Sequence, residues 1–499
     1  MEVAEPGVGP PQGPPAQELI EAGFALEVAD APYLHRGLNL ADIAHVLVLL
    51  EQGIVPAEAA RRLLGLLLEV HRRIPVEAFP YDPSVGDVYN CRERFFVERL
   101  GEDAGWLHAG RPRREAGRVA LRICLRELAA SLVVDAASFA ETVALRAAEL
   151  AEVVMPDQTY LQQAQPSTFG HYVLTFAYPA LRDGERLLQE AGRVDLSPGG
   201  AGCVNGSRLG VDRARTAELL GFGGVIEHTR DAMWQTDGLV ALLAGAASLA
   251  TNLSKLAEDL EIWDSQEFDF VQLAAPYTRA SVLMPQKRNP YALAIVRGAA
   301  GILIGRLSGF LAVVKTPSAR SDNLIFAYGE VPRALELAGR VARLMRGVVA
   351  TLEVHPDRMW ASLEAGFSQA TDLAEFVMQT CGVDYRTAYL VVGDAVRAAA
   401  GSGLRGMDLT GEMLEEAARA RIGRPLGLAD RDLREVLDPR AIVRTRTSPG
   451  GAAPPVVRAM AGDVRTRAED LRGEAERRLA ASREAEAALI GRAEGVVRG

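Results

Sequence analysis

The sequence is dominated by long stretches that are rich in apolar residues and hold at most one proline each. They cover residues 113–155, 168–187, 232–272, 290–316 and 329–354. A helix of about forty residues would be about 60 Å long, far beyond the usual length in globular proteins. Residues 239–260, LVALLAGAASLATNLSKLAEDL, are apolar on too wide a face for an isolated surface helix. These patterns predict an all-α protein with a long helical bundle that other copies of the chain complete.

Shorter elements are expected on either side of this bundle. Residues 1–16 hold five prolines and few apolar side chains, which predicts a disordered arm. We expect an N-terminal helical domain over 17–112, the long bundle over 113–354 and a small domain of short helices over 355–499. No internal repeat indicates a solenoid.

Charge and composition argue against several classes of protein. The chain has 55 basic and 65 acidic residues, a net charge of -10, so nucleic acid is not expected as the main partner. Four scattered cysteines without a CxxC pair favour free thiols in a reducing cytoplasm. The seven histidines show no metal-binding spacing, so neither a metal nor another cofactor is expected. We find no apolar run that approaches a membrane span, which predicts a soluble cytoplasmic protein.

Residues 281–290, SVLMPQKRNP, bring three chemically suggestive side chains together. Ser281 offers an oxygen that could take up a proton, Lys287 a compact positive charge, and Asn289 a neutral amide donor. This set suits a carboxylate that gains negative charge while the carbon beside it loses a proton. On these residues alone, a polar loop between two helices is the alternative.

This segment resembles the signature loop of the fumarase/aspartase superfamily, Gly-Ser-Ser-x-Met-Pro-x-Lys-x-Asn-Pro. The residues that match are Ser281, Met284, Pro285, Lys287, Asn289 and Pro290, whereas Ala280 and Val282 depart. Further segments are similar to the argininosuccinate lyase branch: LHAGRPRRE (107–115), PDQTYLQQAQP (156–166), SPGGAGCVNGSRLGVDR (197–213) and EFDFVQL (267–273).

The resemblance implies a three-domain, mostly helical subunit and a homotetramer whose active sites are each shared between three subunits. It also implies a reversible anti elimination that releases fumarate from a succinyl compound. In this reading Ser281 is the catalytic base, Lys287 and Asn289 stabilise the dianion, and Met284 contacts the substrate.

Other matching positions are candidate substrate-binding residues. Arg113 keeps the second arginine of the Gly-Arg-Ser-Arg motif and could grip a carboxylate, or form a surface salt bridge. Thr159 and Gln165 are plausible carboxylate or loop contacts, with helix capping as the alternative. Asn90 could donate to the substrate or cap the helix that follows it.

The residues that differ from the argininosuccinate lyase branch cluster on the side of the substrate pocket that would hold the leaving amine. Tyr160 replaces the expected histidine, and a tyrosine hydroxyl is a weak proton donor at neutral pH. His171 could take over that role, or be an ordinary helical histidine. Pro112 and Arg114 replace a serine and an asparagine. Arg320 and Ile325 replace a tyrosine and a glutamine, and Gln235–Asp237 lacks an arginine.

These features predict a carbon–nitrogen lyase that forms fumarate from an N-substituted aspartate other than argininosuccinate, similar to ethylenediamine-disuccinate lyases. Because Arg114 and Arg320 add positive charge, we expect a leaving amine that carries an acidic group. Three alternatives stay open: elimination of nitrite from nitrosuccinate, an argininosuccinate lyase with an unusual pocket, and a non-catalytic structural homologue.

Overall fold

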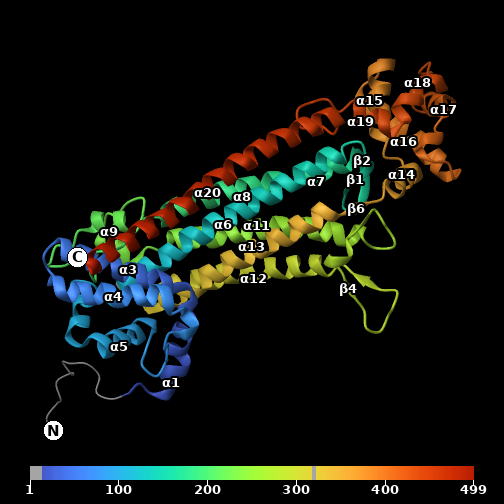
Figure 1. Cartoon of the computed structure of the whole chain (residues 1–499). Helices are drawn as coiled ribbons and strands as arrows, with labels where there is room; N and C mark the ends of the chain where they lie inside the picture. Colours follow the sequence, from blue (N-terminus) through green and yellow to red (C-terminus); the bar gives the residue numbers. More distant parts are fainter. Residues whose placement is uncertain (1–13, 317–321) are drawn as a thin grey trace, which may run out of the picture.

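The computed structural model describes residues 14–316 and 322–499, so most of the arm expected over 1–16 and the candidate Arg320 lie outside the described residues. Over these described residues the fold is all-α, as predicted, with three short two-stranded sheets. An elongated bundle forms its body (Figure 1). The bundle helices are α6 (Arg113–Glu149), α8 (Ala177–Val194), α11 (Asp237–Trp263), α12 (Tyr291–Val314), α13 (Ala327–Thr351) and α20 (Pro454–Arg498).

Small side chains let α6 run through the middle of the bundle. It packs against α8, α13 and α20, and its alanines at 129, 136, 140 and 144 are at most 1% exposed. Alanine is the strongest helix former and allows close approach of neighbouring helices. A helix without proline over its 37 residues therefore spans roughly 55 Å.

The N-terminal helices cover one end of the bundle. The longest are α3 (Ala31–Glu51), α4 (Ala57–Arg73) and α5 (Val88–Leu100). Asp42, which is 1% exposed, accepts from Arg92 at 2.7 Å and from Arg111 at 2.5 Å. Because Arg111 lies two residues before the start of α6, this buried ion cluster fixes where the bundle helix begins.

Short hairpins lie at the opposite end. β1 (Val154–Thr159) pairs antiparallel with β2 (Gln162–Thr168), and β4 (Arg279–Ala280) with β5 (Arg288–Asn289). β3 (Val271–Gln272) pairs with β6 (Glu353–Val354). Thr159 and Gln165 thus lie in strands, so the helix-capping alternative for them is wrong.

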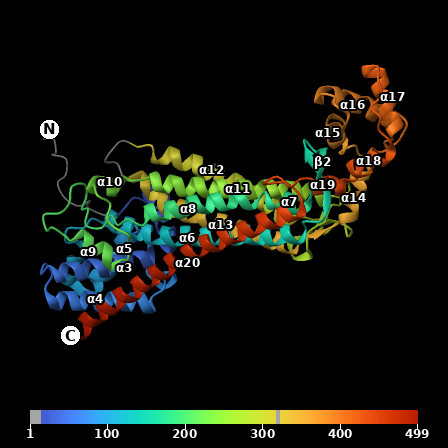
Figure 2. The same ribbon diagram turned by 90° about the horizontal axis from the view of Figure 1, so that it is seen from above.

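The described C-terminal region holds six short α-helices: α14 (Pro356–Ala365), α15 (Ala370–Cys381), α16 (Tyr385–Gly401), α17 (Gly411–Ile422), α18 (Asp430–Leu437) and α19 (Pro439–Arg444). Helices α15 to α18 share an apolar core of their own, whereas Met359 of α14 joins the core of the bundle. These helices project from the end of the bundle (Figure 2).

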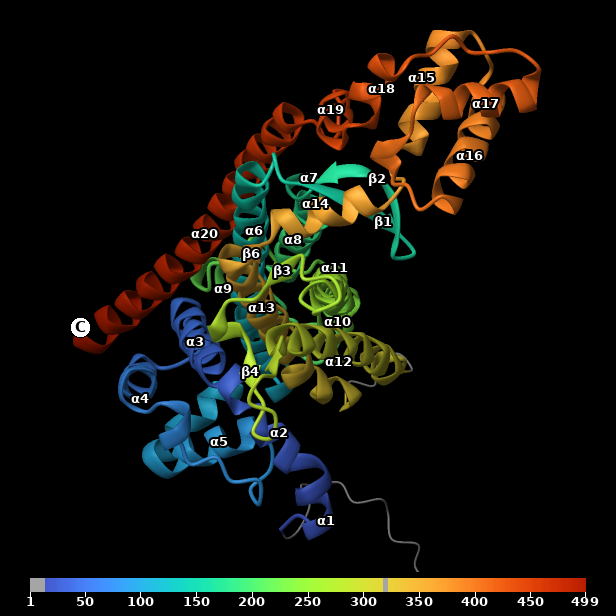
Figure 3. The same cartoon turned by 90° about the vertical axis from the view of Figure 1, so that its right-hand side faces the viewer.

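The expectation of short helices throughout 355–499 is wrong for its last part. α20 is 45 residues long and returns along α6 to the N-terminal helices (Figure 3). Its buried residues Val457, Ala461, Val464 and Ala468 recur every three or four positions among charged ones, which gives the helix one apolar face. The domain boundaries expected from the sequence stay a prediction.

Among the residues that the structure describes, three helices, α6, α11 and α12, are long and apolar enough by length and composition to cross a membrane. The expectation that no segment approaches this length is therefore wrong. These helices pack against one another or their neighbours in the bundle, yet α12 leaves large apolar side chains uncovered. Ile302, Ile304 and Leu311 are 53%, 52% and 48% exposed.

Candidate active site

The loop of residues 281–287 connects β4 to β5 and turns on the hydroxyl of Ser281. This oxygen accepts the backbone N–H groups of Leu283 at 3.2 Å and Met284 at 3.0 Å. Two aligned donors stabilise negative charge on an oxygen. The local fold therefore favours the proton-accepting form that Ser281 would need as a base.

The rest of the loop is largely exposed in the single chain. Lys287 is exposed, and Val282 and Leu283 are more than four-fifths exposed. Asn289 is partly buried and donates through Nδ2 to the carbonyl of Arg279 at 2.9 Å. Ser281, Lys287 and Asn289 thus share one short hairpin, and Met284 lies in the same loop.

Arg113 and Asn90 form a second group at the start of α6. Arg113 Nη1 donates to Asn90 Oδ1 at 2.9 Å and lies 3.5 Å from Asp87 Oδ2. Asn90 is the third residue of α5 and belongs to its capping box, because its Oδ1 accepts from the backbone N–H of Asp87 at 3.3 Å and its own backbone N–H donates to Asp87 Oδ1 at 2.9 Å. Asn90 therefore caps a helix and also orients the guanidinium of Arg113.

The charge of Arg114 is balanced by a residue that the sequence did not single out. Arg114 Nη1 lies 3.0 Å from Glu27 Oε2, and both side chains are largely buried. Burial raises the pKa of Glu27, while Arg114 lowers it. Glu27 is far from the motifs and within the short α2 (Ala25–Ala29), so no sequence signal pointed to it.

Glu115 follows Arg114 in the sequence but binds backbone N–H groups instead of that arginine. Its two carboxylate oxygens accept the backbone N–H groups of Gly200 and Gly202, both at 2.7 Å. Burial raises the pKa of Glu115 to about 7, although these hydrogen bonds and Arg111 lower it. Glu115 therefore holds the glycine-rich 197–210 segment against α6 rather than neutralising Arg114.

Tyr160 stands at the tip of the β1–β2 hairpin. It is 99% exposed, and Tyr160 and Leu161 have φ angles of 55° and 59°. Bulky residues rarely adopt this left-handed conformation, and such strain is often kept where a side chain must be presented. Gln163 Nε2 anchors the hairpin by donating to Ser362 O at 2.8 Å, while Thr159 and Gln165 are exposed.

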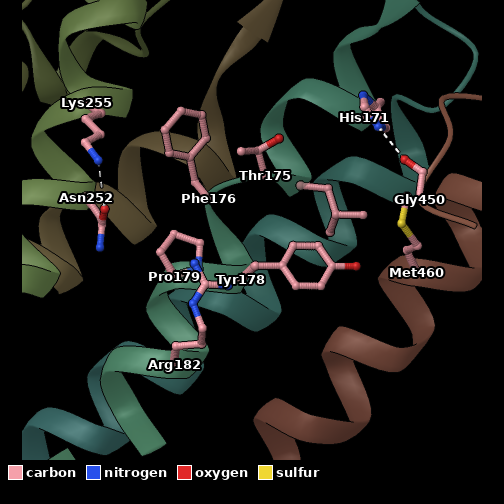
Figure 4. A pocket seen from close by; sticks show the side chains of 11 residues that line it. His171, Thr175, Phe176, Tyr178, Pro179, Arg182, Asn252, Lys255, Gly450 and Met460 are labelled. Atoms are coloured by element: carbon pink, nitrogen blue, oxygen red, sulfur yellow. Dashed lines mark hydrogen bonds between the residues drawn. The ribbon is translucent and has the colours of Figure 1, made fainter. Parts of the chain in front are cut away.

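His171 lies in α7 (Phe169–Leu174) at the edge of a cavity of about 740 Å³ (Figure 4). Its Nε2 donates to the carbonyl of Gly450 at 3.0 Å, so Nδ1 is left to accept from Ser167 Oγ at 3.4 Å. Both ring nitrogens have partners, as in an ordinary helical histidine.

A single chain does not bring these groups together. The β4–β5 loop and the β1–β2 hairpin lie at one end of the bundle, whereas α5 and the start of α6 lie at the other (Figure 1). Ile325 packs against the bundle core. Within residues 14–316 and 322–499, no group of three or more His, Cys, Asp or Glu side chains could hold a metal ion.

Comparison with known proteins decides the family. The sequence matches the Lyase family over residues 51–305 and the argininosuccinate lyase C-terminal family over residues 367–444. It is 33% identical to the argininosuccinate lyase of Methanothrix thermoacetophila, over 84% of this chain and 85% of that one. The chain belongs to the argininosuccinate lyase branch of the fumarase/aspartase superfamily.

Other relatives agree. The argininosuccinate lyase of Methanoculleus marisnigri is 35% identical over 87% of each chain. EDDS lyase in complex with formate shares 26% identity and a TM-score of 0.87, covering 98% of this chain and 97% of the other. A muconate lactonizing enzyme from Pseudomonas putida, with 19% identity and a TM-score of 0.71, shares the fold. The chain is thus a carbon–nitrogen lyase of a superfamily whose members act on small dicarboxylates and produce fumarate.

Proposed function

We propose that this protein catalyses the reversible anti elimination of fumarate from an N-substituted aspartate other than argininosuccinate. The Arg114–Glu27 pair carries the proposal. It places two charged, largely buried side chains where the resemblance puts a neutral asparagine. A pocket that hydrogen-bonds one leaving group discriminates strongly against another, because unmatched buried polar groups stay unpaired.

In the proposed reaction, Ser281 Oγ removes a proton from the carbon adjacent to the one that bears nitrogen. The electrons of that C–H bond form the new double bond, and the C–N bond breaks with its electron pair on nitrogen. Lys287, Asn289 and Arg113 stabilise the negative charge that develops on the substrate carboxylates. Since both ring nitrogens of His171 have partners, Tyr160 is the better placed of the two to assist the departing amine.

The proposed enzyme is a homotetramer with shared sites. Support comes from the separation of the Ser281 loop and the Arg113 group along one subunit (Figure 1). The exposed apolar residues of α12 also favour it, since such a face needs a partner. A cytoplasmic location fits the four free cysteines.

A second candidate is an argininosuccinate lyase with an unusual pocket. The relatives of 33% and 35% identity favour it, because both carry that name. By contrast, Arg114 no longer supports the expectation of an acidic leaving amine, since Glu27 balances its charge.

The test is a screen of the reverse reaction. Purified enzyme is incubated with fumarate and single amines: arginine, ethylenediamine, amino acids and, as the anionic case, nitrite. Loss of fumarate absorbance gives the rate, and mass spectrometry identifies the product. The proposal expects an amine other than arginine to react fastest, and arginine as the best amine by a wide margin would contradict it.

A further inference from the structure

A buried arginine without a partner lies on the second turn of α6. Arg118 is 7% exposed. Within the part of the chain that the structure describes, its Nε and Nη2 atoms have no hydrogen-bond partner. A guanidinium taken out of water without a counter-charge is strongly destabilising, so an unpaired one requires an explanation.

Arg118 belongs to a row of arginines on one face of α6. Arg114, Arg118, Arg122 and Arg126 follow one another at four-residue spacing, which places them along one side of the helix. Arg114 pairs with Glu27. Arg126 Nη1 donates to Asp195 at 3.1 Å. Arg122 donates to the carbonyl of Val194 at 3.1 Å and to Gln235 Oε1 at 2.6 Å.

Arg114 and Arg122, one turn before and one turn after Arg118, both have hydrogen-bond partners. The lack of a partner is therefore confined to the turn that holds Arg118. The Arg122–Gln235 bond also brings residues 234–237 beside the row. In that segment Thr236 stands where the resemblance expects an arginine. The row therefore places arginine side chains of α6 next to residues 234–237, a segment that lacks the arginine expected from the resemblance.

The surroundings of Arg118 suit an anion. Burial lowers the pKa of Arg118, Arg114 lowers it further, and Tyr328 raises it. The hydroxyl of Tyr328 lies 3.1 Å from the position that a Cβ atom on Gly117 would occupy, so glycine leaves room for it. Glu27, the nearby carboxylate, is already engaged by Arg114. A positive side chain beside a phenolic hydroxyl is a good receptor for a carboxylate.

The position along α6 also fits. Arg113, the expected carboxylate contact, begins the same helix, and Arg118 lies five residues further on, about 7.5 Å along the helix axis and about 140° around it. Arg113, Arg114 and Tyr328 line a small common cavity. Arg118 is not part of its lining but lies one helical turn beyond Arg114 on the same face of α6. We propose that Arg118 binds a carboxylate carried by the leaving amine and so determines the specificity of the enzyme. This inference rests on the proposed function, since it assigns the amine half of that substrate.

The first test compares amines that differ only in charge. Wild-type enzyme and the Arg118→Gln variant are assayed with fumarate and either β-alanine or β-alaninamide, and likewise glycine or glycinamide. We expect wild type to prefer the carboxylate member of each pair by about tenfold or more in kcat/KM. Arg118→Gln should lose that preference through slower reaction of the carboxylate amine alone, and Arg118→Lys should retain part of it. A preference that persists in Arg118→Gln overturns the inference.

The second test does not depend on turnover, so it separates this inference from the proposed function. Arg118→Met keeps the length of the side chain and removes its charge. In the absence of substrate it should raise the melting temperature by about 2–4 °C, because an unpaired buried charge is removed. Arg340→Gln, an exposed arginine on α13 that is paired with Glu336 at 3.4 Å, is the matched control and should change little. A lower melting temperature for Arg118→Met would show a structural role and overturn the inference, even if arginine proves the preferred amine.

Discussion

Ser281 accepts the backbone N–H of Met284 through its own side-chain oxygen, at a distance of 3.0 Å. An alcohol is a very weak acid in water, so a serine base needs donors that stabilise the negative charge on its oxygen once its proton is lost. Here the loop supplies two, from residues 283 and 284. The same two hydrogen bonds also hold the turn of the loop, so the conformation of the loop and the stabilisation of the Ser281 oxygen depend on each other.

Ser281→Ala should lower kcat by at least about a thousandfold, as expected when an essential acid–base group is lost. The oligomeric state should be unchanged, since Ser281 is partly exposed and lies outside the bundle. Fumarate release is followed by ultraviolet absorbance, and assembly by light scattering. Near-normal release of fumarate by the folded variant would rule out Ser281 as the base.

Mixing two inactive variants should restore activity. In the proposed tetramer, a Ser281→Ala subunit still supplies an intact Arg113, and an Arg113→Ala subunit still supplies an intact Ser281. Co-refolded mixtures should therefore contain some sites with both residues and regain about a quarter of wild-type activity for random assembly. Each variant refolded alone is the control. If the mixture stays inactive, each subunit carries its own complete site.

Tyr160→Phe should slow turnover without changing the stability of the folded protein. Removal of the hydroxyl should slow turnover by about 10–100-fold if it assists the leaving amine. Because Tyr160 is 99% exposed in the subunit, the melting temperature should change little. Leu161→Gly is the companion variant, since glycine accepts φ of 59° without strain, and it should stabilise the subunit by about 1 kcal/mol. Unchanged turnover by Tyr160→Phe would remove Tyr160 from the reaction.

The buried carboxyl of Glu115 should make stability depend on pH. Its pKa is about 7 in the folded chain against 4.5 for an unperturbed glutamate. The folded state therefore holds more protons than the unfolded state between these values, and stability falls as pH rises through this window. We expect Glu115 to contribute a loss of about 2–3 kcal/mol between pH 5 and pH 8.

Glu115→Gln provides the control, because other carboxylates with raised pKa values add to the pH dependence. Denaturant unfolding at both pH values should show a shallower dependence in Glu115→Gln than in wild type. Identical pH dependence in the two proteins would contradict the prediction.

Much of the bundle could be predicted from the sequence, because its helices are long and interrupted by few prolines. The stretch 290–316 becomes α12 (Tyr291–Val314), and 329–354 becomes α13 (Ala327–Thr351). The β1–β2 hairpin could not be foreseen, since its turn uses Tyr160 and Leu161 where glycine or asparagine is usual. The sequence pattern does not predict the length of α20, because its apolar positions are mostly small and lie among many charges.

Less of the candidate site than of the bundle could be predicted from the sequence. The motifs identify Ser281, Lys287 and Arg113 by their spacing, but they say nothing of counter-charges. Glu27 reaches Arg114 across 87 positions of the chain, and the missing partner of Arg118 is visible only once the bundle is assembled. Both facts concern the balance of buried charge, which depends on tertiary contacts and not on local pattern.

Because α6 packs against α20, which is synthesised much later, α6 must wait for its partner during translation. Roughly 300 residues separate the end of α6 from the start of α20. At ordinary translation rates α6 leaves the ribosome about 15–60 s before its partner exists. During that interval the α6 surface that α20 will cover is exposed, so the nascent chain is a natural client for a chaperone that shields apolar helices.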